Sequence, residues 1–250
     1  MYKFMCSVLL AMVFPFILVA NDHTGKLFAE GNRQYAKGQY EDAIKSYSKL
    51  IDSGYHAPEL YYNLGNAYYK TDEIPSAILY YEKAYKLAPG DGGIRVNLQL
   101  ANSKITDKIE TVPEFFLAKW WRGFLLMLSS NAWCISAVLC LLIGFSLLVV
   151  YLFSSVIRVK KGSFYAGVVL LAMGLLFIIM AKWQRSYFDD EKHAIVFTGV
   201  ADVKSGPDKN MKTLFVIHEG LKVSIEGREN NWLRIALPNG SIGWVESAAV

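Results

Sequence analysis

The residue types that most often perform catalysis are too scattered in this chain to form a reactive centre. Each histidine stands alone in a different segment, without the serine, cysteine or carboxylate partners that nucleophilic catalysis or metal binding requires. The stretch Gly90-Asp91-Gly92-Gly93 is rich in glycine but lacks the following Lys-Ser/Thr pair of a phosphate-binding loop. We therefore expect no catalytic residue, no metal ligand and no cofactor. The histidines are His23, His56, His193 and His218.

A different chemistry, hydrogen bonding to a peptide, is indicated by amides and phenols that recur 34 residues apart. Asn32 is followed by Asn66, and Tyr35 by Tyr69. The same interval relates small and hydrophobic residues, and all the matches have spacings that fit helices. The other matching pairs are Gly31 and Gly65, Ala43 and Ala77, Ile44 and Ile78, and Tyr47 and Tyr81.

The elements that would position these residues resemble the tetratricopeptide repeat, a pair of antiparallel helices. The resemblance implies an all-α domain over residues 21–112, with repeats at 24–57 and 58–91 and a capping helix at 94–109. In that family, small residues let the two helices approach while aromatic residues fill the space between them. The pattern residues of the second copy are Tyr61, Leu64, Gly65, Tyr68, Ala77, Tyr81, Ala84 and Pro89.

The resemblance also implies a peptide-binding groove, because the first helices of such repeats line a concave surface. Some relatives clamp a C-terminal carboxylate with basic residues. Here Phe28, Gly93 and Asn97 occupy those positions, so we expect an extended or helical peptide and no carboxylate clamp. The residues at the groove positions are Phe28, Asn32, Tyr35, Tyr62, Asn63, Asn66, Tyr69, Lys70, Asn97 and Lys104.

Two interpretations of these groove positions stay open. Because a buried asparagine is costly without hydrogen-bond partners, Asn32, Asn66 and Tyr69 could either bind a peptide or complete the packing. Tyr47 and Tyr81 fit packing between helices better. If the groove is the binding site, alanine at Asn32, Asn66 and Tyr69 together should weaken partner capture without unfolding the domain.

The composition indicates a membrane protein, since 53% of the residues are hydrophobic and only 19% are charged. Residues 1–20 are typical of a secretory signal peptide. Two later runs, 132–153 and 164–181, are long enough to span a bilayer. Neither contains a charged residue or a histidine, so we expect an anchor and no transport pathway. Gly167 and Gly174 share one face of the second run and would let the two helices pack closely.

The charge distribution supports the same organisation. Residues 21–112 carry 11 basic and 12 acidic side chains and residues 183–250 carry 8 and 9, so the positive surplus flanks the apolar segments. That arrangement suits bilayer interfaces and argues against a nucleic-acid partner. The short basic loop 154–163 favours the cytoplasm, and the signal peptide favours export of the residues before the first span. We therefore expect a two-pass protein of a bacterial inner membrane with both soluble domains in the periplasm.

Residues 113–131 join the repeats to the first span. Apolar residues from position 116 onward recur with helical spacing, and Lys119 and Arg122 fall outside that stripe. Trp120 and Trp121 suit the headgroup region of a bilayer. We expect an interfacial amphipathic helix that contacts lipid. The alternative is an ordinary aromatic belt at the start of the span.

After a linker at 182–192, residues 193–250 alternate short β-branched and aromatic runs with turn signals, which predicts five strands. The stretches Asn231-Trp232-Leu233-Arg234-Ile235 and Gly240-Ser241-Ile242-Gly243-Trp244-Val245 resemble the bacterial SH3 domain, SH3b. The resemblance implies a small all-β barrel. Some SH3b domains bind peptidoglycan, so Trp232 and Trp244 are either packing residues or a ligand platform.

The order of the parts resembles the BatE family of bacterial aerotolerance operons. The resemblance implies a subunit of a BatA/BatB-type complex, with von Willebrand A-type membrane proteins and an associated MoxR-type ATPase as partners, that serves envelope stress tolerance. The expected fold is thus a multidomain membrane protein with a helical repeat domain, a transmembrane hairpin and an SH3b barrel. The first hypothesis for its function is a periplasmic scaffold for protein partners. The second is a cell-wall sensor or tether that binds peptidoglycan through SH3b.

Overall fold

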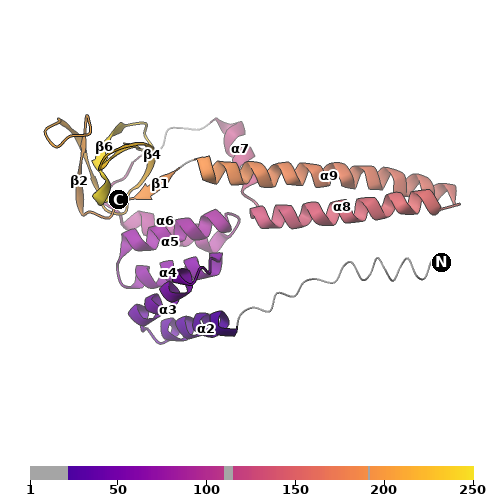
Figure 1. Ribbon diagram of the computed structural model, residues 1–250, viewed down its shortest axis with the longest axis horizontal. Helices are drawn as coiled ribbons and strands as arrows, with labels where there is room; N and C mark the ends of the chain where they lie inside the picture. Colours follow the sequence, from indigo (N-terminus) through magenta and orange to yellow (C-terminus); the bar gives the residue numbers. More distant parts are fainter. Residues whose placement is uncertain (1–21, 110–114, 191) are drawn as a thin grey trace. The chain divides into compact units, whose positions relative to one another are not determined.

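The computed structural model describes residues 22–109, 115–190 and 192–250 (Figure 1). The expected signal peptide lies outside these ranges. The chain divides into two compact units, residues 1–55 and 56–250, and each is described by itself.

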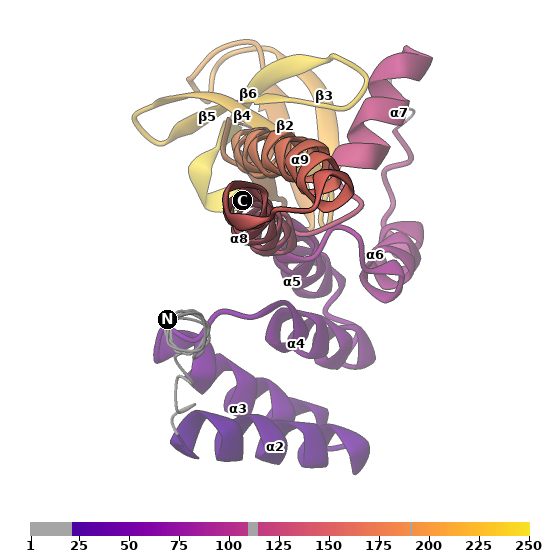
Figure 2. The ribbon, with the colours of Figure 1, turned by 90° about the vertical axis from the view of Figure 1, so that its right-hand side faces the viewer.

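The first unit is a helical hairpin of α2 (Asp22–Ala36) and α3 (Tyr40–Asp52), which lie side by side (Figure 2). The chain reverses at Gly38, whose φ of 76° lies in the left-handed region that glycine adopts without strain. Ala43, Tyr47 and Leu50 of α3 are fully buried. Gly31 lies directly against Tyr47, because a Cβ at position 31 would come within 2.5 Å of the ring.

The second unit repeats this arrangement in α4 (Pro58–Lys70) and α5 (Ile74–Leu87), followed by α6 (Gly92–Lys104). A Cβ at Gly65 would lie 2.7 Å from the Tyr81 ring, so this glycine performs the role of Gly31. The turn before α5 places Asp72 at a φ of 63°, which costs energy for a residue other than glycine. The Asp91 carboxylate starts α6 by accepting hydrogen bonds from the backbone N–H groups of the first turn.

The capping helix is shorter than the expected 94–109, because α6 ends at Lys104 and Ile105 is extended. The following residues pack on the C-terminal sheet instead of continuing the helix. Ile105 and Ile109 contact its hydrophobic core. The Asp107 carboxylate accepts hydrogen bonds from the backbone N–H of His218 at 2.7 Å and pairs with its ring Nδ1 at 2.8 Å.

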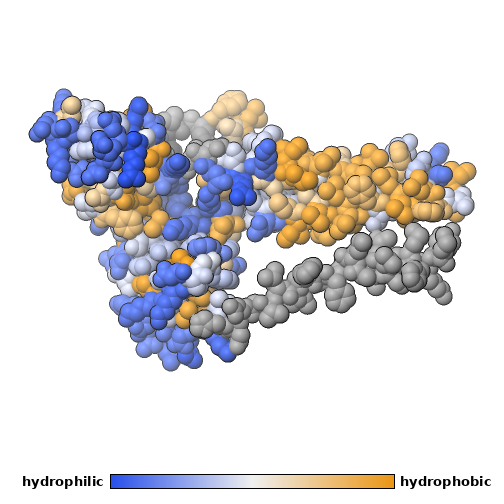
Figure 3. Space-filling model, viewed as in Figure 1, coloured by the Kyte–Doolittle hydropathy of each residue, from blue (hydrophilic) through white to orange (hydrophobic). Residues whose placement is uncertain are grey.

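The membrane-like part of the second unit begins with α7 (Phe116–Leu125) and continues with α8 (Ser130–Phe153) and α9 (Ile157–Asp190). Within the described residues, α8 and α9 are the two helices long and apolar enough to cross a membrane, and most of their side chains are exposed, unlike those of a soluble protein's core helix. Hydrophobic side chains cover both helices over most of their length (Figure 3).

The two long helices pack closely at glycines. A Cβ at Gly144 would lie 3.1 Å from the carbonyl oxygen of Gly167, and one at Gly174 would lie 2.8 Å from the side chain of Leu141. The expected close approach at Gly167 and Gly174 is therefore present. The expected loop 154–163 is mostly helical, because α9 already begins at Ile157, and most of the expected linker 182–192 belongs to the same helix.

The C-terminal residues form six antiparallel strands in the order β1-β4-β5-β6-β2-β3. The sheet is open, so the expected closed barrel is not confirmed. Its core contains Val203, Ile217, Val223, Ile235 and Val245. The five expected strands omitted one, β2. The strands are β1 (His193–Ile195), β2 (Val200–Lys204), β3 (Thr213–His218), β4 (Lys222–Glu229), β5 (Trp232–Ala236) and β6 (Ile242–Glu246), with a short helix η1 (Ser247–Ala249) after them.

Candidate protein-interaction site

In the first unit the groove residues of α2 are already engaged with α3. The Tyr47 hydroxyl donates a hydrogen bond to Oδ1 of Asn32 at 2.8 Å. The Phe28 and Tyr47 rings lie 6.0 Å apart, and the Tyr35 and Tyr40 rings meet edge to face at 5.3 Å. Asn32 is nevertheless exposed, so one side of its amide faces solvent while the other side fixes the helix pair.

The second unit repeats this bond and extends it to a third helix. The Tyr81 hydroxyl donates to Oδ1 of Asn66 at 2.7 Å. The same oxygen accepts from Nδ2 of Asn97 at 2.8 Å, and Nδ2 of Asn97 also donates to the Tyr62 hydroxyl at 3.0 Å. Tyr62, Asn66 and Asn97, predicted separately as groove residues, thus form one network across α4, α5 and α6.

A second contact joins the end of α4 to the end of α6. The Lys104 ammonium lies 4.5 Å from the centre of the Tyr69 ring and 2.9 Å from the Asp72 carboxylate. The hydrogen bond with Asp72 raises the pKa of Lys104 above its ordinary value. Lys70 is exposed and Asn63 is half-buried on the same helix as Tyr69. This end of the array therefore offers a cation, an aromatic face and a carboxylate to a partner.

Sequence reasoning placed the right residues on the right helices but missed which atoms they use. The repeat of Tyr47 at Tyr81, read with the repeat of Asn32 at Asn66, was the available signal for the two tyrosine–asparagine bonds. No comparable signal marked the Asn97 bond, because α6 has no counterpart in the first copy. Both interpretations of the asparagines, binding and packing, remain compatible with these contacts.

The residues expected at the membrane interface lie on α7, close to the C-terminal end of α9. Trp120 is 69% exposed, whereas the Trp121 ring packs edge to face against Trp183 at 5.5 Å. The buried Gln184 amide donates hydrogen bonds to the carbonyl oxygens of Leu125 and Leu128 at the end of α7. Those oxygens would otherwise lack partners at a helix terminus. Lys119 and Arg122 supply positive charge to α7.

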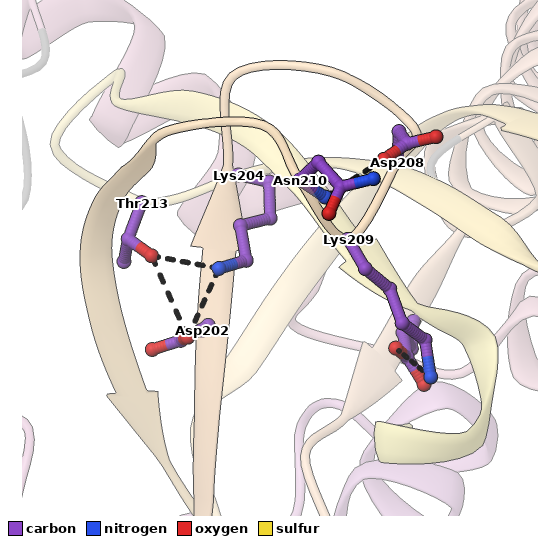
Figure 4. Close-up of polar contacts among 7 residues, drawn as sticks. Asp202, Lys204, Asp208, Lys209, Asn210 and Thr213 are labelled. Carbon is purple, nitrogen blue, oxygen red and sulfur yellow. Dashed lines mark hydrogen bonds and ion pairs between the residues drawn. The ribbon is translucent and has the colours of Figure 1, made fainter.

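The sheet carries a second candidate site, a cavity of about 360 Å³ beside β2 and β6. Trp232 lines it and is 8% exposed. Lys204 at its edge donates to the Thr213 hydroxyl at 2.8 Å and to Asp202 at 3.2 Å (Figure 4). Lys209 pairs with Glu246 across 3.2 Å.

The second tryptophan named as a ligand candidate, Trp244, is half-buried on β6, in register with Arg234 on one neighbouring strand and Lys204 on the other. The two tryptophans therefore have different surroundings, since Trp232 lines a cavity and Trp244 packs between two basic side chains. Within the described ranges, no group of three or more His, Cys, Asp or Glu side chains could hold a metal ion.

Comparison with known proteins gives one family match and several structural likenesses. Residues 28–92 match the family model of the tetratricopeptide repeat. No curated protein matches the chain.

The structural likenesses are all to repeat proteins of low identity. The chain is similar to the Sgt2 TPR domain from Aspergillus fumigatus, with 15% identity and a TM-score of 0.32 over 70% of this chain and 87% of that one. It is similar to the Yersinia enterocolitica type III secretion chaperone SycD in complex with a peptide of the translocator YopD, with 17% identity and a TM-score of 0.32 over 64% of this chain and 98% of that one. For the complex of the yeast Sti1 TPR2B domain with pHsp70, the identity is 16%, the TM-score 0.31 and the coverage 66% and 100%.

TM-scores of this size carry no conclusion about function, so the family match alone assigns the helical part. The glycine–tyrosine contacts at Gly31 and Gly65 agree with it, because they bring two helices together in each copy. Tetratricopeptide repeats are protein–protein interaction scaffolds. Residues 28–92 are therefore a tetratricopeptide-repeat region.

Proposed function

We propose that this chain is a membrane-anchored scaffold that binds protein partners through its repeat helices in the bacterial periplasm. The observation that carries the proposal is the joining, in one chain, of a tetratricopeptide-repeat region to two apolar helices that pack as a hairpin through Gly144, Gly167 and Gly174. The hairpin would hold the repeats at the membrane surface, where partners that are themselves membrane proteins are concentrated.

The partners proposed are von Willebrand A-type membrane proteins, with an associated MoxR-type ATPase, in a BatA/BatB-type complex that serves aerotolerance or envelope stress. The proposal rests on the resemblance of the domain order to the BatE family. A groove that offers Asn66, Asn97, Tyr69 and Lys104 would accept a peptide through backbone hydrogen bonds and aromatic contacts.

Site-specific photo-crosslinking in intact cells tests the groove. A photoreactive residue at Lys70, exposed on the first helix of the second repeat, should capture a protein partner. The matched control is Lys45, an exposed lysine on a second helix, which should capture much less. Equal capture at both positions would refute the groove assignment.

Membrane topology is tested separately. Protease added outside spheroplasts should cleave both 22–109 and 192–250, because the two ends of the hairpin would place both domains in the periplasm. Protection of either domain would contradict the proposed topology without affecting the repeat assignment.

A second function is favoured by the cavity that Trp232 lines on the sheet. Its charged edge, with Lys209 and Glu246, could bind the peptide part of peptidoglycan and make the protein a cell-wall sensor or tether. The full chain in detergent micelles should then bind purified sacculi, and Lys209→Ala should reduce that binding. Absence of binding by the unaltered chain would leave the scaffold as the proposal.

A further inference from the structure

The cleft between α7 and α9 has the shape and lining of a ligand site. It measures about 470 Å³, within the roughly 300–1,000 Å³ typical of small-molecule sites. Its walls come from two helices that Gln184 and the Trp121–Trp183 contact hold together. The lining residues are Ala118, Trp121, Arg122, Leu125, Trp183, Ser186 and Tyr187.

The lining combines two kinds of surface. Trp121, Leu125 and Trp183 give an apolar and aromatic wall continuous with the hydrophobic surface of α9. Arg122 and Ser186 add a guanidinium and a hydroxyl to the same cleft. A ligand that fits must therefore have a long apolar part joined directly to a group that accepts hydrogen bonds.

The charge around the cleft selects an anion. Residues 115–188 contain no Asp or Glu, while Lys119, Arg122, Lys182 and Arg185 fall near the two ends of α7 and α9 that meet here. Arg185 shares its charge with Asp189 across 3.5 Å. Arginine binds phosphate through two parallel hydrogen bonds, which makes Arg122 the principal anion-binding group of the lining.

We infer that this cleft binds a single anionic glycerophospholipid, with its phosphate on Arg122 and Ser186 and an acyl chain against Trp121 and Trp183. The inference rests on the membrane anchoring proposed above. It goes beyond general contact with a bilayer, because it assigns one lipid to a defined site at the junction of the interfacial helix and the second span. The bound lipid would fix the angle between α7 and α9.

Tryptophan fluorescence in detergent micelles tests the site on the full chain. Phosphatidylglycerol with brominated acyl chains should quench the emission at low lipid fractions, since Trp121 and Trp183 line the cleft. Loss of the charged hydrogen bonds in Arg122→Gln should raise the lipid fraction for half-quenching roughly 10-fold or more. The matched control is Arg158→Gln at the other end of the hairpin, which should leave that value unchanged.

The outcomes separate the lipid site from its alternatives. Equal binding by wild type and Arg122→Gln, or an equal loss in Arg158→Gln, would overturn the site. Competition by inorganic phosphate alone would identify a soluble phosphate as the occupant and overturn the lipid assignment. Flotation with vesicles tests anchoring independently, so a chain that floats but shows no Arg122 dependence refutes only the lipid site. A chain that does not float refutes both proposals.

Discussion

Asn97 donates a hydrogen bond from its side-chain nitrogen to the side-chain oxygen of Asn66, over 2.8 Å. The bond links two groove positions that lie 31 residues apart on α4 and α6. Since Asn66 also accepts from the buried Tyr81, its amide supports the array as well as facing a prospective partner. The expectation that alanine at Asn66 leaves the domain unaffected must therefore be revised, and binding and stability have to be measured by different variants.

Asn66→Ala should destabilise the second repeat by about 1–3 kcal/mol, because the Tyr81 hydroxyl loses its acceptor. Asn66→Asp keeps an acceptor oxygen for both Tyr81 and Asn97 and should cost much less. Hydrogen exchange of the α5 amides measures the local stability. Equal exchange in the two variants would show that the acceptor oxygen does not stabilise the repeat.

Gly31→Ala and Gly65→Ala should each destabilise their helix pair by about 1–3 kcal/mol, since the new methyl group would overlap the ring of Tyr47 or Tyr81. Gly25→Ala is the matched control on α2, where the added Cβ meets no atom within 4 Å. It should be neutral or stabilise the helix by up to about 1 kcal/mol. Thermal unfolding followed by circular dichroism would distinguish the variants, and similar midpoints for Gly25→Ala and Gly31→Ala would contradict the packing described.

Gly174→Leu should weaken the membrane hairpin, because its Cβ position already lies 2.8 Å from the Leu141 side chain and 3.2 Å from the Ala137 carbonyl oxygen. Gly162→Leu has open space at the same distance and serves as the control. We expect a lower unfolding midpoint in micelles for the first variant alone. A hairpin that tolerates both substitutions equally does not pack through this face.

Tyr61 should make the repeat region sensitive to alkaline pH. Burial, with a smaller contribution from Tyr80, raises the pKa of Tyr61 above its ordinary value of 10.0. Above that pH the unfolded chain releases the phenolic proton while the folded chain keeps it, so stability falls as the pH rises. Tyr61→Phe should reduce this pH dependence, and Tyr55→Phe, an exposed control, should not. Denaturant unfolding at a series of alkaline pH values provides the slopes, and an unchanged slope in Tyr61→Phe would remove Tyr61 as the cause.

The parts of the fold that follow from local pattern could be predicted, and those that depend on distant partners could not. The interval of 34 residues predicted the equivalent roles of Gly31 and Gly65, because each contacts an aromatic residue 16 positions further along the chain. The end of α6 could not be predicted, because Asp107 leaves the helical array to bind His218 and that pairing has no local signal. The extension of α9 past position 181 likewise depends on Gln184, a polar residue whose partners, Leu125 and Leu128, lie on another segment.

The strand β2 was missed for a related reason. Val200–Lys204 alternates buried and exposed residues over only five positions, and Gly199 and Gly206 flank it with turn signals. Its place in the sheet depends on pairing with β3 and on a single registered pair, Lys204 with Trp244 of β6. The candidate site was predicted at the level of residues and helices, whereas the Asn66–Asn97 bond required the structure.

The most direct test of the scaffold is affinity purification of the tagged full-length chain after cross-linking in intact cells. The proposal predicts co-purification of von Willebrand A-type membrane proteins, with a strong reduction when Lys70→Glu places a negative charge on the exposed groove position and no reduction for Lys45→Glu on α3. Recovery of muropeptides without any protein partner would contradict the scaffold and make the sheet the binding domain.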